Sequence, residues 1–167
     1  IDANSGALSF LSAPDYEAAQ DSNADNVYDV QVSVSDGLGA TDSQSLAITV
    51  TDLDEVAPVI TSGATAGAID ENSGADQVVY TATADDSADI SAGVTFSLKA
   101  NNSDDAGSFS IDASTGAVSL TADPDHEIKA SYSFTVIATD AAGNASEQTV
   151  SLNINDLNET TVNDVLE

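Results

Sequence analysis

Residues 111–118 read IDASTGAV and residues 1–8 read IDANSGAL, so one acidic phrase occurs twice within a chain of 167 residues. Three further acidic phrases recur in the same order. They are DYE (15–17) and DHE (125–127), SDG (35–37) and TDA (139–141), and TDLDE (51–55) and NDLNE (155–159). The chain therefore contains a repeated unit, and this repeat guides the prediction of the fold.

The spacing between the copies changes once along the chain. The first two pairs of phrases are offset by 110 positions and the last two by 104, so the first copy carries six additional residues between Glu17 and Tyr28. Recurring apolar residues refill a core, but carboxylates that recur at strand ends need a different reason. We interpret them as ligands of a hard cation, because carboxylate oxygens bind such ions. For any single Asp, the alternative is a turn in which its side chain accepts a backbone N–H.

The charge of the chain excludes several partners. Lys99 and Lys129 are the only basic side chains against 29 acidic ones, and the formal net charge is −27. This charge repels phosphate, so neither nucleic acid nor an anionic membrane is expected as a partner. It favours cations as partners. The alternative explanation for the excess of acidic residues is a solvated, salt-adapted surface. The absence of Cys excludes disulfides and thiolate metal sites, and no stretch reads as a signal peptide or as a segment inserted in a membrane.

The spacing of hydrophobic residues along the sequence indicates an all-β chain. Strands with period-two alternation are expected at 28–34, 46–50, 133–138 and 150–154, and further strands at 78–83 and 94–98. A turn rich in Gly and polar residues separates strand 28–34 from strand 46–50, and a similar turn separates strand 133–138 from strand 150–154. Short strands at this spacing predict an antiparallel sandwich.

The repeat also predicts the domain boundaries. Residues 57–159 hold one complete unit, and residues 1–56 hold the second half of a unit with a linker. Residues 160–167 are a tail, read as the start of a further repeat followed by a cloning remnant at Leu166-Glu167. Because a half unit of this size leaves one sheet face uncovered, we expect residues 1–56 to fray or to form a strand-swapped homodimer with a second copy. A chain that opens in mid-repeat without Met is interpreted as a fragment of a longer protein.

These motifs together resemble the cadherin repeat, in the cadherin-like form found in very large bacterial surface adhesins. The motifs are the acidic opening DEN (70–72), the phrase FSIDASTG (109–116), the Asp-x-Glu pair, the strand end ATD (138–140) and the linker DLDEVAP (52–58). The family linker reads Asp-x-Asn-Asp-Asn-x-Pro, so Asp and Pro keep their spacing here. The resemblance implies antiparallel Greek-key β-sandwich repeats in tandem, extracellular on a bacterial cell surface.

The resemblance also implies Ca²⁺ at the joints between repeats, since Ca²⁺ takes about six to eight oxygen ligands, more than one short loop supplies. For the joint between the two units it implies the side chains of Asp15, Glu17, Asp52, Asp54, Glu55, Asp86 and Asp140, with Asp85 as a substitute or helper, and the backbone oxygens of Leu53 and Val56. For a second joint beyond the complete unit it implies Glu71, Asp125, Glu127, Asp156, Asn158 and Glu159. Asp36 matches Asp140 in the first copy.

Catalysis is not expected. His126 is the only histidine, and alternation with period two would direct it away from its neighbours Asp125 and Glu127. No nucleophile elbow is present. The predicted function is therefore a Ca²⁺-binding extender module in which the ion stiffens each joint of a rod used in cell adhesion. The partners are then the neighbouring repeats. The alternatives are a module that recognises polysaccharide or a like repeat on another cell-surface protein, and a passive acidic spacer.

Overall fold

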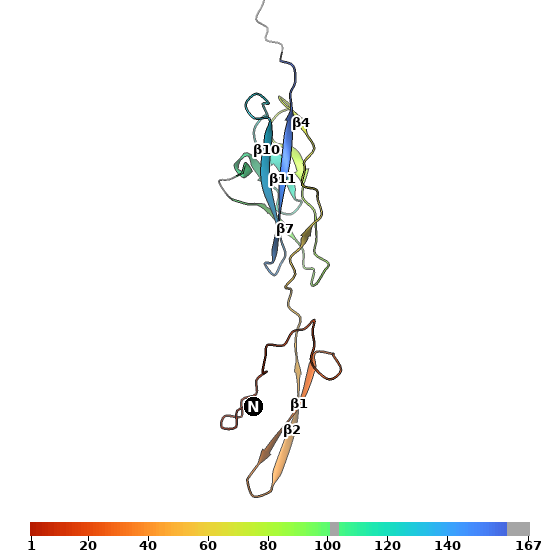
Figure 1. Ribbon diagram of the computed structural model, residues 1–167, viewed down its shortest axis with the longest axis vertical. Coiled ribbons are helices and arrows are strands. Elements are labelled where there is room, and N and C mark those ends of the chain that lie inside the picture. The colour runs from red at the N-terminus through yellow and green to blue at the C-terminus, as the bar shows by residue number, and fades with distance from the viewer. Residues whose placement is uncertain (101–103, 160–167) are drawn as a thin grey trace, which may run out of the picture. The chain divides into compact units, whose positions relative to one another are not determined.

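The computed structural model describes residues 1–100 and 104–159 and divides into two units, Ile1–Leu53 and Asp54–Glu167 (Figure 1). The predicted tail at 160–167 lies outside the described residues.

The second unit is a β-sandwich. Its strands are β3 (Val59–Ile60), β4 (Ile69–Asp70), β5 (Gln77–Thr81), β6 (Ala84–Asp85), β7 (Thr95–Leu98), β8 (Phe109–Ile111), β9 (Ala117–Leu120), β10 (Ser131–Thr139) and β11 (Ala145–Asn155), with the short helix η1 (Ala106–Ser108) before β8. One sheet has the order β4-β11-β10-β7 and a second has the order β5-β9-β8, while β3 pairs with β6. All of these pairings are antiparallel except β4 with β11. The predicted all-β sandwich is confirmed.

The core lies between the two larger sheets. Phe134 on β10 and Leu152 on β11 are fully buried, as are Val118 and Leu120 on β9. The Phe134 ring contacts Tyr80 and Phe109, with ring centroids 5.9 and 4.5 Å apart. Along β11, buried Val150, Leu152 and Ile154 alternate with exposed residues, which is the period that the sequence predicts for a strand with one face on a core.

The turn between β8 and β9 explains one of the repeated carboxylates. The Asp112 Oδ1 atom accepts the backbone N–H groups of Ser114 and Thr115 at 3.0 and 2.8 Å. Gly116 closes this turn with a φ of +70°, and a Cβ at this position would lie 2.3 Å from the Ala82 carbonyl oxygen. Asp112 therefore serves as the hydrogen-bond acceptor that this turn requires.

The first unit is a single hairpin with an irregular segment before it. Strand β1 (Val27–Ser35) pairs antiparallel with β2 (Thr41–Thr49). All residues of this unit are described, and none of them is buried. Leu8 and Phe10 are 39% and 41% exposed, and the Phe10 ring meets Tyr28 edge-on at 5.0 Å.

Among the described residues, no helix has the length and apolar character that a crossing of the bilayer requires.

Candidate functional site

Carboxylates gather where the chain enters the second unit, and we call Asp54, Asp86, Asp89 and Asp140 the entry cluster. Burial, followed by the negative charge of Asp140 and then those of Asp86 and Asp89, raises the pKa of the Asp54 carboxyl, although the Val56 backbone N–H opposes the shift. The Asp86 Oδ2 atom is buried and has no hydrogen-bond partner among the described residues. Like charges this close disfavour ionisation, so the cluster needs a counter-charge.

The β10–β11 hairpin holds one side of the entry cluster in place. Asp140 follows β10, and its Oδ1 atom accepts the backbone N–H groups of Gly143 and Asn144 at 2.7 and 2.8 Å. The Asn144 side chain donates to Asp140 Oδ2 at 2.9 Å and to the carbonyl oxygen of Asp54 at 3.0 Å. Burial raises the pKa of Asp140, but the hydrogen bonds from Asn144 and Gly143 outweigh it and lower the net value. Asn144 thus ties the incoming chain to the hairpin.

The segment after β6 supplies the other side, with one residue that the sequence prediction missed. Asp85 is exposed, and its Oδ1 atom accepts the Ser87 N–H at 3.0 Å, which makes it a turn cap. Asp89 was not predicted, although it is the third acid of the run DDSAD. Its Oδ2 atom accepts the Glu55 N–H at 3.3 Å. Leu53, Glu55 and Val56, also predicted as ligands, are exposed.

The predicted ligands of the first unit occupy a turn and the end of the unit. Asp15 Oδ1 accepts the Ala18 N–H at 3.0 Å, and Glu17 lies exposed in the same turn. Asp52 is half-buried, and its Oδ1 atom has no hydrogen-bond partner among the described residues. Asp36 accepts the Leu38 and Ala40 N–H groups at 2.7 and 3.1 Å, which repeats the role of Asp140 in its own hairpin.

A second group of titratable side chains lies where β11 ends, and we call Glu71, His126, Glu127, Asp156 and Glu159 the exit cluster. One carboxylate oxygen from each of Glu71, Glu127 and Glu159 lies within 4.8 Å of the other two. His126, Glu127 and Asp156 likewise each contribute one possible ligand atom, and these three atoms lie within 4.8 Å of one another. The sequence predicted every acid of this cluster.

Glu71 is the buried centre of the exit cluster, with 1% of its surface exposed. Its Oε1 atom accepts the Leu157 N–H at 2.5 Å and its Oε2 atom accepts the His126 N–H at 2.8 Å. These two backbone donors, Leu157 first, lower the pKa of the Glu71 carboxyl, so the buried group stays charged. One carboxylate therefore joins the 125–127 segment to the end of β11.

Glu127 shows that the exit cluster also lacks counter-charge. The backbone N–H of Glu127 lowers the pKa of its own carboxyl, but burial, a hydrogen bond with Glu71 and the charges of Glu71 and Asp156 together raise it. The only two basic side chains of the protein are paired elsewhere, Lys99 with Glu147 at 2.7 Å and Lys129 with Asp105 at 2.6 Å.

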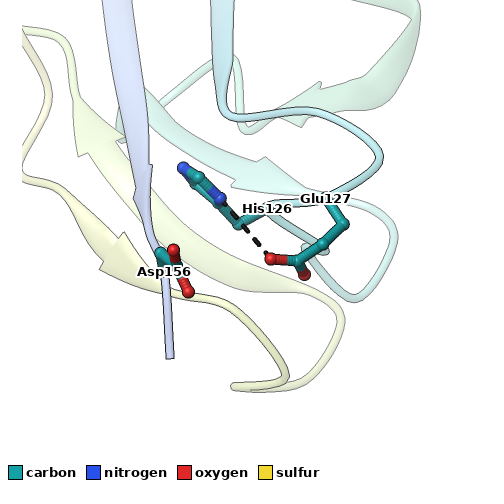
Figure 2. Close-up of side chains that lie close together, drawn as sticks. All are labelled: His126, Glu127 and Asp156. Atoms are coloured by element: carbon teal, nitrogen blue, oxygen red, sulfur yellow. Dashed lines mark ion pairs between the residues drawn. The ribbon is translucent and has the colours of Figure 1, made fainter. Parts of the chain in front are cut away.

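Asp125, a predicted ligand at this end, lies outside both groups of the exit cluster. Its Oδ1 atom accepts the Ile128 N–H at 2.9 Å in a turn, and predicted Asn158 is exposed. The predicted orientation of His126 is wrong. Residues 126–128 form a turn and not a strand, so alternation does not apply, and the His126 and Glu127 side chains lie close together beside Asp156 (Figure 2).

Comparison with known proteins identifies the family and the fold of this chain. The family model of the cadherin domain matches residues 53–155. A structure of protocadherin gamma B2 extracellular cadherin domains 3–6 is 20% identical, with 90% of this chain and 39% of that chain covered and a TM-score of 0.58. A structure of mouse cadherin-23 EC22–24 is 22% identical, with 79% and 43% covered and a TM-score of 0.55.

These structures show the fold, and this chain spans less than half of their length. No curated protein matches the sequence. The family match covers more than half of the chain and nearly all of the second unit. The chain therefore belongs to the cadherin family.

Proposed function

We propose that the chain is a Ca²⁺-binding extender module of a large bacterial cell-surface adhesin, in which the ion stiffens the joints between repeats. Cadherin domains are extracellular adhesion modules, not enzymes, and generally bind Ca²⁺. One observation carries the proposal for this chain. Both ends of the second unit gather carboxylates, while its Lys side chains pair elsewhere.

The entry cluster suits a hard cation. Its side-chain donors are oxygens, and Asp86 Oδ2 is a buried acceptor with no hydrogen-bond partner among the described residues. Asp54, Asp86 and Asp140 would supply ligands together with Asp89, and the first unit would add Asp15, Glu17 and Asp52 as the sequence predicts. Bound Ca²⁺ would supply the positive charge that offsets the repulsion between these neighbouring carboxylates. Without it, their repulsion favours a bent and mobile linker.

The exit cluster suits the lower half of a second joint. Glu71 is held charged and immobile by two backbone donors, so it would be a pre-organised ligand beside Glu127 and Glu159. Asp156 follows β11 directly and would join them.

Calorimetric titration with CaCl₂ tests the proposal. We expect saturable binding at about 0.1–1 mM, the range of extracellular Ca²⁺ modules. Asp86→Asn should remove the heat of the entry cluster, and Glu127→Gln that of the exit cluster. Asp29→Asn removes an exposed carboxylate from β1 and should change nothing. Equal heats from MgCl₂, or heats that no variant changes, would overturn the proposal.

The mechanical part of the proposal has its own test. Ca²⁺ should increase the radius of gyration measured by X-ray scattering and slow proteolysis within residues 52–58. The Asp86→Asn protein should show neither effect at the same Ca²⁺ concentration. If Ca²⁺ binds but leaves both quantities unchanged, the ion is bound without stiffening the rod.

A second copy of the chain is the proposed partner of the first unit. None of residues 1–53 is buried. An open apolar pocket of about 430 Å³ is lined by Leu8, Phe10, Tyr28, Val30 and Ile48. Strands from a second copy would cover this face, since an isolated hairpin is marginal in water. Sedimentation velocity should then show a concentration-dependent dimer that Phe10→Ser weakens, and a monomer at every concentration would contradict it.

A further inference from the structure

His126, Glu127 and Asp156 form a compact mixed group at the exit end of the second unit (Figure 2). One ligand atom from each residue lies within 4.8 Å of the other two. The His126 Nδ1 atom is 3.8 Å from Glu127 Oε1, which is too long for a hydrogen bond between them. The three side chains come from two segments, the 126–128 turn and the residue after β11.

Buried Glu71 keeps these two segments together. Its two oxygens accept the backbone N–H groups of His126 and Leu157, and these residues lie next to Glu127 and Asp156 in the chain. The backbone of both segments is therefore held by a buried residue that is not itself a member of the group. Such support is what a metal site requires of its surroundings.

The donor set differs from that of a calcium site. Ca²⁺ takes oxygen ligands, whereas imidazole nitrogen suits Zn²⁺, Cu²⁺ and Ni²⁺. In a tetrahedral zinc site, bonds of about 2.0–2.1 Å place two ligand atoms about 3.3 Å apart. The spacing of 3.8 Å between His126 Nδ1 and Glu127 Oε1 needs only a small closing movement to reach that value.

We propose that His126, Glu127 and Asp156 bind a transition-metal dication of the zinc class, with a ring nitrogen and two carboxylate oxygens as ligands and water in the fourth position. Glu127 belongs to this group and also to the all-oxygen group of Glu71 and Glu159. A zinc-class ion and a calcium ion at this end would therefore compete for the Glu127 carboxylate. The proposal does not depend on calcium binding.

The first copy of the repeat provides a matched comparison. Its phrase DYE at 15–17 corresponds to DHE at 125–127, so Tyr16 stands where the second copy has His126. His126→Tyr gives the second copy the sequence of the first, removes the nitrogen ligand and keeps both neighbouring acids. Because loss of an outer-shell partner costs about 10–100-fold in metal affinity, loss of a direct ligand should cost at least about tenfold.

The single histidine makes the test specific. In the full chain labelled with ¹⁵N, all imidazole NMR signals come from His126. One equivalent of ZnCl₂ should shift the ring nitrogens of His126, and calorimetry should give one zinc ion per chain. His126→Tyr should weaken this binding at least tenfold, while an unchanged melting temperature shows that the variant is folded.

Three results would overturn the proposal. They are imidazole signals that ZnCl₂ leaves unmoved, zinc binding that His126→Tyr does not weaken, and ring-nitrogen shifts equally large with CaCl₂. The last would mean that His126 responds to nearby charge and is not a ligand. A failure of the CaCl₂ titrations described above would leave these readouts intact.

Discussion

The β1–β2 and β10–β11 hairpins occupy corresponding positions of the repeat and share one register, but only the second has buried residues. Tyr28 is opposite Ile48 in the first hairpin, and Tyr132 is opposite Leu152 in the second. Strands β4 and β7 flank the second hairpin, and Leu152 is fully buried. The first hairpin pairs with no further strand, and no residue of its unit is buried. Local sequence thus sets the hairpin, whereas stability depends on what covers it.

The largest expected effect comes from matched truncations in the two hairpins. Leu152→Ala should lower the free energy of unfolding of the second unit by about 2–5 kcal/mol, because it leaves a cavity in a packed core. Ile48→Ala, at the corresponding half-buried position, should cost under about 1.5 kcal/mol. Urea denaturation followed by circular dichroism, with amide exchange in each hairpin, measures both. Equal losses would mean that the first hairpin has a packed core of its own.

A second comparison uses the glycines of the repeated turn. Gly116 and Gly6 have φ values of +70° and +73°, but only at Gly116 would a Cβ meet backbone, the Ala82 carbonyl oxygen at 2.3 Å. Gly6→Ala should therefore cost only the left-handed penalty of about 1–2 kcal/mol. Gly116→Ala should cost more, because the turn must also move away from Ala82. Thermal denaturation of the two variants separates these effects, and a smaller loss at Gly116 would contradict the close contact.

The long elements were predictable from the sequence and the short ones were not. Residues 28–34 and 133–138 alternate over enough positions to identify β1 and β10. Strands such as β3, β4 and β6 have two residues each, too few for a period to be visible. Their pairing depends on the assembled sheets and not on their own sequence.

The candidate site was predictable where a repeated phrase or the family resemblance includes its residues. Asp54 and Asp140 lie in repeated phrases, Asp86 was implied by the resemblance, and all three are members of the entry cluster. Asp89 was missed, since neither a repeated phrase nor the resemblance includes it. Asp125 was predicted as a ligand, and its Oδ1 atom accepts a backbone N–H in a turn. The sequence does not distinguish these two roles, because the same residue type serves both.

The smallest expected effect is a pH dependence shared by the two copies of the turn. Hydrogen bonds from the Ser114 side chain and then from Thr115 lower the pKa of Asp112 from 3.8 to about 2. The Ser5 backbone N–H, followed by its hydroxyl, also lowers the pKa of Asp2. Because the folded pKa lies below the unfolded value, each turn should be stabilised above pH 3.8 and lose that contribution as the pH falls through the folded pKa, about 2 for Asp112.

Carboxyl ¹³C titration by NMR measures both pKa values. Titration of Asp2 and Asp112 near 3.8 would show that these turns do not hold the carboxylates as described.

The most direct test of the central claim is a residue-resolved NMR titration of the full chain with CaCl₂, set beside MgCl₂. If the two ends of the cadherin unit are calcium sites, shifts will concentrate at Asp54, Asp86 and Asp140 and at Glu71 and Glu127. Asp112, already held within its turn, will not respond. Shifts spread evenly over the acidic residues, Asp112 among them, or equal for the two ions, would contradict the claim and leave the carboxylates as general surface charge.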